Sequence, residues 1–208
     1  ERFSGLKKIP EDPAQRLLAA NNAKLKTKLT TPANATVPVV LAELDAVEAW
    51  IDMVRLISVC LPAREVVWWA CLAGRDLVGL DGDSVCLKSA EAWVFKPNDE
   101  NRAHLGRVIE SESSGDKAAL CATAAYYAPG NLGLGDMAGI PAPVGVVSAC
   151  AFGINLKTLK IGKEPDKRLR FAIERGLDIA RGGNGAIEFA SFEAPAPAAA
   201  PAKAAQEG

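Results

Sequence analysis

Apolar residues recur at helical spacing along most of this chain, and this periodicity constrains the fold more than any other feature. Between residues 38 and 60 they follow alternating intervals of four and three, at Val40, Leu44, Val47, Ile51 and Val54. Charged residues take the opposite side of the same segment, at Glu43, Glu48, Asp52 and Arg55. This spacing predicts an amphipathic helix with a buried apolar stripe and a solvated charged face. Leu61-Pro62 ends it, because the residue before a proline disfavours helical geometry.

Residues 64–78 form the next predicted helix, which is apolar nearly all round apart from its ends. A helix without a polar face belongs in the interior of a domain. We therefore expect this helix to lie at the centre of the fold, with Trp69, Ala70, Ala73 and Leu77 buried.

Further helical segments are predicted as far as residue 181. Turns containing glycine or proline separate them, as at residues 79–83, 113–115 and 129–142, and Gly182-Gly183 ends the last one. Only residues 186–192 alternate in the way that a short strand would. The sequence therefore predicts an all-α fold of seven to eight helices stacked as antiparallel hairpins, as in helical-repeat proteins.

Composition divides the chain into three parts. Residues 1–30 form a basic N-terminal arm, residues 31–186 the helical domain, and residues 187–208 a tail rich in alanine and proline. The arm and tail contain few large apolar residues, so neither is expected to offset a backbone ordering cost of about 1–2 kcal/mol per residue. We expect neighbouring chains to order both ends, which predicts a subunit of a larger protein assembly.

Length, composition and charge exclude several classes of protein. The chain has 208 residues, 49% of them apolar, and a net charge of −1. These values are typical of a globular domain, and the near-neutral charge disfavours a nucleic-acid partner. No apolar run approaches the roughly 20 residues that cross a bilayer, and residues 1–20 lack the apolar centre of a signal peptide. We expect a cytoplasmic protein without a transmembrane segment.

Metal and cofactor chemistry has little support in the sequence. The chain has five cysteines, no two of them close together, and one histidine, His104. Zinc sites combine several closely spaced Cys or His ligands. We therefore expect no metal and no cofactor, five buried thiols without disulfides, and a partly exposed helical histidine without a catalytic role.

Two features keep an enzymatic alternative open. The glycine-rich loop at residues 129–142 contains Gly133, Gly135 and Gly139, but their spacing and the absence of a preceding strand depart from a dinucleotide fingerprint. Glu48 and Asp52 lie one helical turn apart and would form an acid–base pair if they faced a pocket. The simpler interpretation of these two carboxylates is a solvated helix face. An enzyme with an acidic and polar site around the loop is our second hypothesis.

The Trp68-Trp69 dipeptide is the most unusual feature of the predicted central helix. Adjacent helical side chains point about 100° apart. Either both rings lie in the core, or Trp68 reaches a partner surface, where tryptophan is a common anchor.

Basic residues of the arm form a second set of candidates for partner binding. They are Arg2, Lys7, Lys8, Lys24, Lys26 and Lys28. Such a set would suit an acidic protein, a lipid surface or nucleic acid, and the lack of interleaved aromatic residues disfavours nucleic acid.

Residues 61–72, LPAREVVWWACL, resemble the most characteristic stretch of an uncharacterised bacterial family often encoded near type VI secretion genes. An alanine-rich helix at residues 118–127, a proline-containing connector at 129–143 and the LDIAR ending at 177–181 extend the resemblance over about residues 38–183. The family implies a cytoplasmic helical accessory protein and supplies no catalytic residues. Our leading functional hypothesis is a non-catalytic protein-binding adaptor, chaperone-like protein or structural subunit, linked to a secretion system. A peripheral membrane or nucleic-acid binder that uses the arm is the third.

Overall fold

The computed structural model describes residues 2–79, 82–111 and 114–197, and within them the regular structure is helical. The longer helices are α2 (Val37–Ala46), α3 (Trp50–Cys60), α4 (Ala63–Val78), α5 (Val85–Phe95), α6 (Asp99–Ser111), α7 (Ala119–Tyr127), α8 (Val146–Lys157) and α9 (Pro165–Arg181). Three short pieces accompany them: α1 (Ala14–Ala20) and the 3₁₀ turns η1 (Gly135–Gly139) and η2 (Thr158–Lys160). The prediction of an all-α fold is confirmed.

The described residues contain no strand, only two isolated β-bridges, which join Pro13 to Thr36 and Asn131 to Pro141. The predicted short strand at residues 186–192 is wrong, because this segment is irregular. Directly before this segment, the Gly185 N–H donates a hydrogen bond to the Asp178 carboxylate at 2.8 Å.

Among the described residues, no helix has both the length and the apolar character needed to cross a membrane.

Helix α4 lies at the centre of the molecule, as its apolar sequence predicts. It packs against α5 and α7 on one side and against α8 and α9 on the other, while α6 covers α5 and α7 from outside. Trp69, Ala70 and Ala73 are buried as expected, whereas Leu77 is only half-buried because it lies in the last turn of the helix.

The predicted amphipathic helix between residues 38 and 60 is two helices. Helix α2 ends at Ala46 and α3 begins at Trp50, and Glu48 between them has a left-handed φ of 54°. The Ala49 N–H donates to the Leu44 carbonyl at 2.8 Å, which closes the end of α2. Val47 is consequently 58% exposed, contrary to its predicted place in the buried stripe.

The predicted solvated face of this segment is wrong for Glu43 and Asp52, which are 5% and 4% exposed. It is right for Glu48, which is exposed. The change of direction at Glu48 turns α3 relative to α2, so a single helical pattern does not describe which of their side chains meet water.

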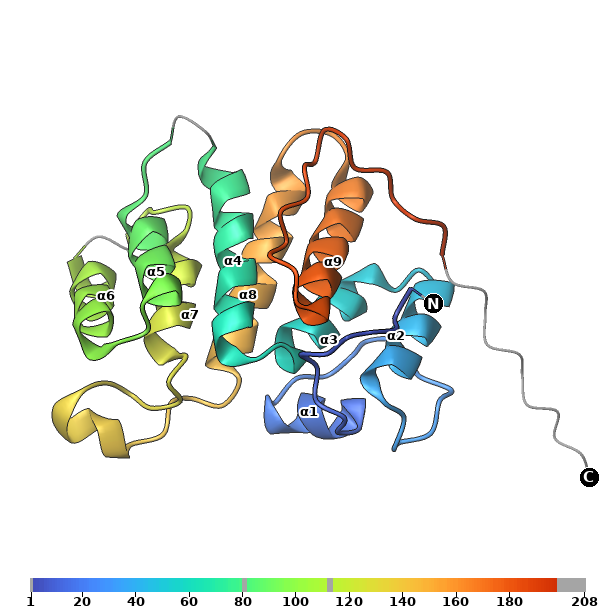
Figure 1. The fold of residues 1–208 in the computed structure, drawn as a ribbon, viewed down its shortest axis with the longest axis horizontal. Helices are drawn as coiled ribbons and strands as arrows, with labels where there is room; N and C mark the ends of the chain where they lie inside the picture. The colour runs from blue at the N-terminus through green and yellow to red at the C-terminus, as the bar shows by residue number, and fades with distance from the viewer. Residues whose placement is uncertain (1, 80–81, 112–113, 198–208) are drawn as a thin grey trace, which may run out of the picture.

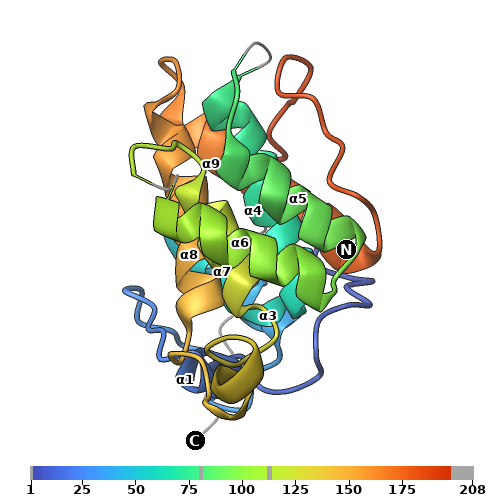
Figure 2. The same ribbon diagram turned by 90° about the vertical axis from the view of Figure 1, so that its left-hand side faces the viewer.

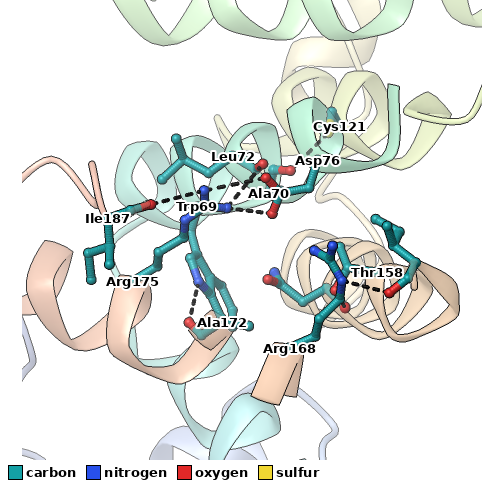
Figure 3. A network of polar contacts seen from close by, with 12 residues as sticks. Trp69, Ala70, Leu72, Asp76, Cys121, Thr158, Arg168, Ala172, Arg175 and Ile187 are labelled. Carbon is teal, nitrogen blue, oxygen red and sulfur yellow. Dashed lines mark hydrogen bonds and ion pairs between the residues drawn. The ribbon is translucent and has the colours of Figure 1, made fainter. Parts of the chain in front are cut away.

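Trp69 joins α4 to α9 at the centre of the core. Its indole N–H donates to the Ala172 carbonyl at 3.0 Å (Figure 3). The backbone of α9 comes close here because residue 176 is glycine: a Cβ at this position would lie 2.7 Å from Ile57 Cγ2 and 3.4 Å from the Trp69 ring. Arg175 adds an ion pair to Asp76 at 2.6 Å, also visible in Figure 3.

We expect Trp69→Ala to lower the free energy of unfolding by about 3–5 kcal/mol, the range for large aromatic residues in cores. Urea unfolding followed by far-UV circular dichroism measures the loss. Trp68→Ala is the matched control. It should lower the free energy of unfolding clearly less than Trp69→Ala does, because Trp68 is only half-buried. A loss below about 1 kcal/mol for Trp69→Ala would contradict the central place of this side chain.

Candidate functional site

Two buried carboxylates bind the backbone of the N-terminal segment, residues 2–31. Glu43 on α2 accepts hydrogen bonds from the N–H groups of Thr30 and Thr31 and from the Thr30 hydroxyl. Asp52 on α3 accepts from the N–H groups of Lys26 and Thr27, at 2.9 and 2.7 Å. Buried charges need such partners, so these residues are structural acceptors. Glu48 is exposed in the turn between the helices and lines a pocket together with Asp52, the condition set for the alternative of an acid–base pair. The Asp52 carboxylate, however, already accepts from two backbone N–H groups.

Arg2 and Lys8 attach the beginning of the segment to α2, α4 and α9. Arg2 forms ion pairs with Asp45 and Glu174, both at 2.5 Å, and Phe3 beside it is buried. The Lys8 ammonium lies 2.5 Å from the Glu65 carboxylate, and its backbone N–H donates to the Ala180 carbonyl. Residues 2–11 thus pack against their own domain, where the sequence led us to expect a neighbouring chain.

The remaining candidate lysines are exposed. Lys24, Lys26 and Lys28 point outward from an extended run in which Leu25 and Leu29 pack against the core. The alternation of burial resembles that of a strand on a surface. Lys7 lies apart from them, beside a groove between the N-terminal segment and α2. The six basic candidates of the arm therefore do not form one continuous basic surface.

Residues 187–197 also pack against the helical domain. Phe189 and Phe192 contact Phe171 of α9, with ring centroids 5.2 and 5.3 Å apart. Arg168 lies over the Phe189 ring at 4.1 Å. The first part of the predicted tail therefore covers one side of α9. Residues 198–208, the rest of that tail, lie outside the described residues.

Trp68 and Phe95 form an aromatic pair on the surface between α4 and α5. Their ring centroids lie 5.8 Å apart in an edge-on arrangement, and Phe95 is 68% exposed. The Trp68 indole N–H donates to the Asn184 carbonyl at 2.8 Å. Arg75 lies over the Trp68 ring at 4.9 Å. We call Trp68, Phe95 and the side chains around them the aromatic surface.

Charged residues surround the aromatic surface. Arg75 pairs with Glu91, and Glu65, one turn before Trp68, pairs with Lys8. The Arg64 guanidinium donates to the Val94 carbonyl at 2.6 Å, and Lys96 directly follows Phe95. Neither Arg64 nor Lys96 has a carboxylate partner within ion-pair distance among the described residues. The surface therefore has positive charge that is not neutralised locally.

Phe95 was not among the candidates from the sequence, although a signal for it exists. It follows Lys88 and Ala92 at intervals of four and three residues, so it shares the exposed side of α5 with a lysine. A large aromatic residue on such a side is unusual and points to an interaction.

The glycine-rich loop of the enzymatic hypothesis borders a pocket of about 380 Å³. Arg102 of α6 lies at this pocket and holds the loop by donating to the carbonyls of Tyr126, Asn131 and Gly133, at 2.9, 2.8 and 3.1 Å. Asp99 is the one carboxylate among the residues that line this pocket. A general acid and a general base need two groups at the reacting atoms, and the lining of this pocket supplies one carboxylate.

Neither His104 nor any acidic or thiol group is placed for metal binding in the described part of the chain. His104 is exposed on α6. No group of three or more His, Cys, Asp or Glu side chains lies close enough together to hold a metal ion there.

Glu43 has an unusual pKa for a buried carboxyl group. Burial raises its pKa, but the hydrogen bonds from Thr30 and Thr31 favour the ionised form and lower it from the usual 4.5 to about 2. Protonation is therefore easier in the unfolded chain. The stability that Glu43 contributes is fully present above pH 4.5 and is lost as the pH falls towards 2.

We expect Glu43→Gln to destabilise the protein most near neutral pH, because glutamine cannot accept the same set of charge-assisted hydrogen bonds. The difference in unfolding free energy between wild type and variant should narrow as the pH falls from 4.5 to about 2. Urea unfolding at several pH values measures it. A constant difference across that range would contradict the assigned role of the carboxylate.

All five cysteines are buried thiols, as their apolar context predicts. Burial raises the pKa of Cys150 to about 11 and raises that of Cys60 further. Because the thiolate is the reactive form, we expect a thiol reagent such as Ellman's to label the native protein very slowly and all five thiols after unfolding. Rapid stoichiometric labelling of the native protein would contradict this.

A comparison with protein-family models matches residues 40–180 to a family of unknown function, DUF6931. The match covers more than half of the chain. The chain belongs to the DUF6931 family. Searches of curated proteins and of solved structures find no match.

The DUF6931 region runs from α2 to α9 and agrees closely with the segment that resembles an uncharacterised bacterial family. It includes the aromatic surface, Arg102 and the carboxylates Glu43 and Asp52. The backbone groups that these two carboxylates bind, at residues 26–31, precede the matched region.

Proposed function

We propose that this chain is a non-catalytic protein-binding adaptor or structural subunit, which holds a partner protein against the aromatic surface. The observation that carries the proposal is the exposed Phe95 ring, packed edge-on against Trp68. Aromatic side chains are the commonest anchors of protein interfaces, because covering one removes a large apolar area from water. A partner that covers the exposed Phe95 ring would gain the free energy of removing that apolar area from water.

The charges around the aromatic surface indicate the chemistry of the partner. Arg64 and Lys96 lie beside the two rings, and among the described residues no carboxylate is within ion-pair distance of either. Complementary charge speeds association and selects among partners. We therefore propose a partner segment with an apolar or aromatic side chain flanked by acidic residues.

The place of this protein in the cell is part of the proposal. We propose that it acts in the cytoplasm as one subunit of a larger protein assembly linked to type VI secretion. The support is the resemblance carried by residues 61–72 and 177–181.

Phe95→Ala tests the proposal, since an exposed residue can be replaced with little effect on folding. We expect the variant to bind at least tenfold more weakly to the protein that co-purifies stoichiometrically with the tagged wild-type chain, as anchor residues do. Binding is measured by titration calorimetry with the purified partner. Arg64→Glu should weaken binding too, and its effect should shrink at high salt.

Val144→Ala is the matched control. Val144 is as exposed as Phe95, at 68%, and lies in the loop before α8. It should bind the partner as the wild type does. Equal binding by Phe95→Ala and wild type would show that the partner uses another surface and would refute the proposal.

A further inference from the structure

The pocket beside the glycine-rich loop combines apolar walls with a few convergent polar groups. The loop meets the junction of α5 and α6 at one end of the molecule (Figures 1 and 2). Residues from both the loop and this junction line the pocket. Trp93, Pro97, Pro129 and Leu134 contribute apolar surface to it. Its volume, about 380 Å³, falls within the range of small-molecule sites.

Arg102 supplies a buried positive charge at this pocket. The residue is 3% exposed, and its hydrogen bonds go to three backbone carbonyls. A guanidinium has five N–H groups, so these bonds leave two for another acceptor. No ion pair among the described residues includes Arg102. Carbonyls supply only partial negative charge, and a buried charge without an ionic partner is costly.

Asn131 supplies a hydrogen-bond acceptor at the pocket. Its side-chain oxygen is buried and has no hydrogen-bond donor in the structure. Buried acceptors in proteins are normally satisfied. The same residue lines the pocket, and its backbone carbonyl accepts from Arg102 at 2.8 Å, so the backbone of Asn131 lies next to the guanidinium.

We propose that this pocket binds a ligand in which a carboxylate stands next to an N–H group and an apolar side chain. The carboxylate accepts from the two remaining N–H groups of Arg102, and the ligand's N–H donates to the Asn131 oxygen. The apolar side chain packs against Trp93 and Leu134. The C-terminal residue of a peptide has this chemistry, and so does a free N-acylated amino acid. The inference is independent of the aromatic surface.

N-acetyl-L-leucine is the probe, with N-acetyl-L-leucinamide as the control that lacks the carboxylate. We expect the acid to shift the indole N–H signal of Trp93 in ¹⁵N-correlated NMR spectra at millimolar concentration, with the signal identified by Trp93→Phe. The amide should bind at least about tenfold more weakly, since it loses a charge-assisted pair. Equal binding of acid and amide, or no shift of the Trp93 signal, would overturn the proposal.

Acetylated tetrapeptides ending in leucine distinguish the two sources of this chemistry. Tighter binding of the peptide than of N-acetyl-L-leucine would identify chain termini as the ligands. Weaker binding would identify free amino-acid derivatives. Both results require the free carboxylate, so an amidated peptide that binds as well as the free acid counts against the proposal.

Ala138→Phe provides the test on the protein side. Ala138 is exposed and lines the pocket, so a phenylalanine fills space there without disturbing the core. The neighbouring Met137 is also exposed but is not among the lining residues, so Met137→Phe is the matched control. We expect Ala138→Phe to lose binding of the acid and Met137→Phe to retain it. Unchanged binding by Ala138→Phe would place the ligand elsewhere. Arg102 itself is a poor target, because it also holds the loop.

Discussion

The hydrogen bond from Trp69 to Ala172 fixes the centre of this molecule. An indole N–H that is removed from water needs an acceptor, and on a helix buried on nearly all sides that acceptor must come from a neighbouring element. The Ala172 carbonyl provides it at 3.0 Å. A carbonyl oxygen has two lone pairs, so it can accept this bond within an intact helix. The bond requires close approach of α9 to α4, and Gly176 permits that approach.

The N-terminal segment depends on the helices that this bond positions. Arg2 reaches Asp45 on α2 and Glu174 on α9 together, so its two ion pairs form only when α2 and α9 are correctly placed. Lys8 bonds to the last turn of α9 through its backbone N–H. The segment therefore stabilises an arrangement that the core has already set. Its basic residues are used partly within the chain, which is why a count of their charges is a poor guide to a partner.

Much of the fold could be predicted from the local spacing of apolar residues. The buried carboxylates Glu43 and Asp52 could not. The all-round apolar sequence of residues 64–78 identified the central helix, because a helix without a polar side has no stable place outside a core. The same reasoning assigned Glu43 and Asp52 to solvent. Their partners are backbone N–H groups 12 to 26 residues earlier in the chain, and backbone groups leave no sequence signal. Arg102 escaped prediction for the same reason, since its three acceptors are backbone carbonyls.

Trp68 and Trp69 show how the core also determines the aromatic surface. The two rings leave α4 on different sides, and each donates its indole N–H to a backbone carbonyl: Trp69 to α9, Trp68 to Asn184 just beyond α9. The bond from Trp69 positions α9, and it thereby also positions the Asn184 carbonyl that accepts from Trp68. Trp68 is then held by that carbonyl and by Arg75 above its ring. A ring held in one orientation loses little conformational entropy when a surface covers it, so the rigidity of the core carries over to the exposed aromatic pair.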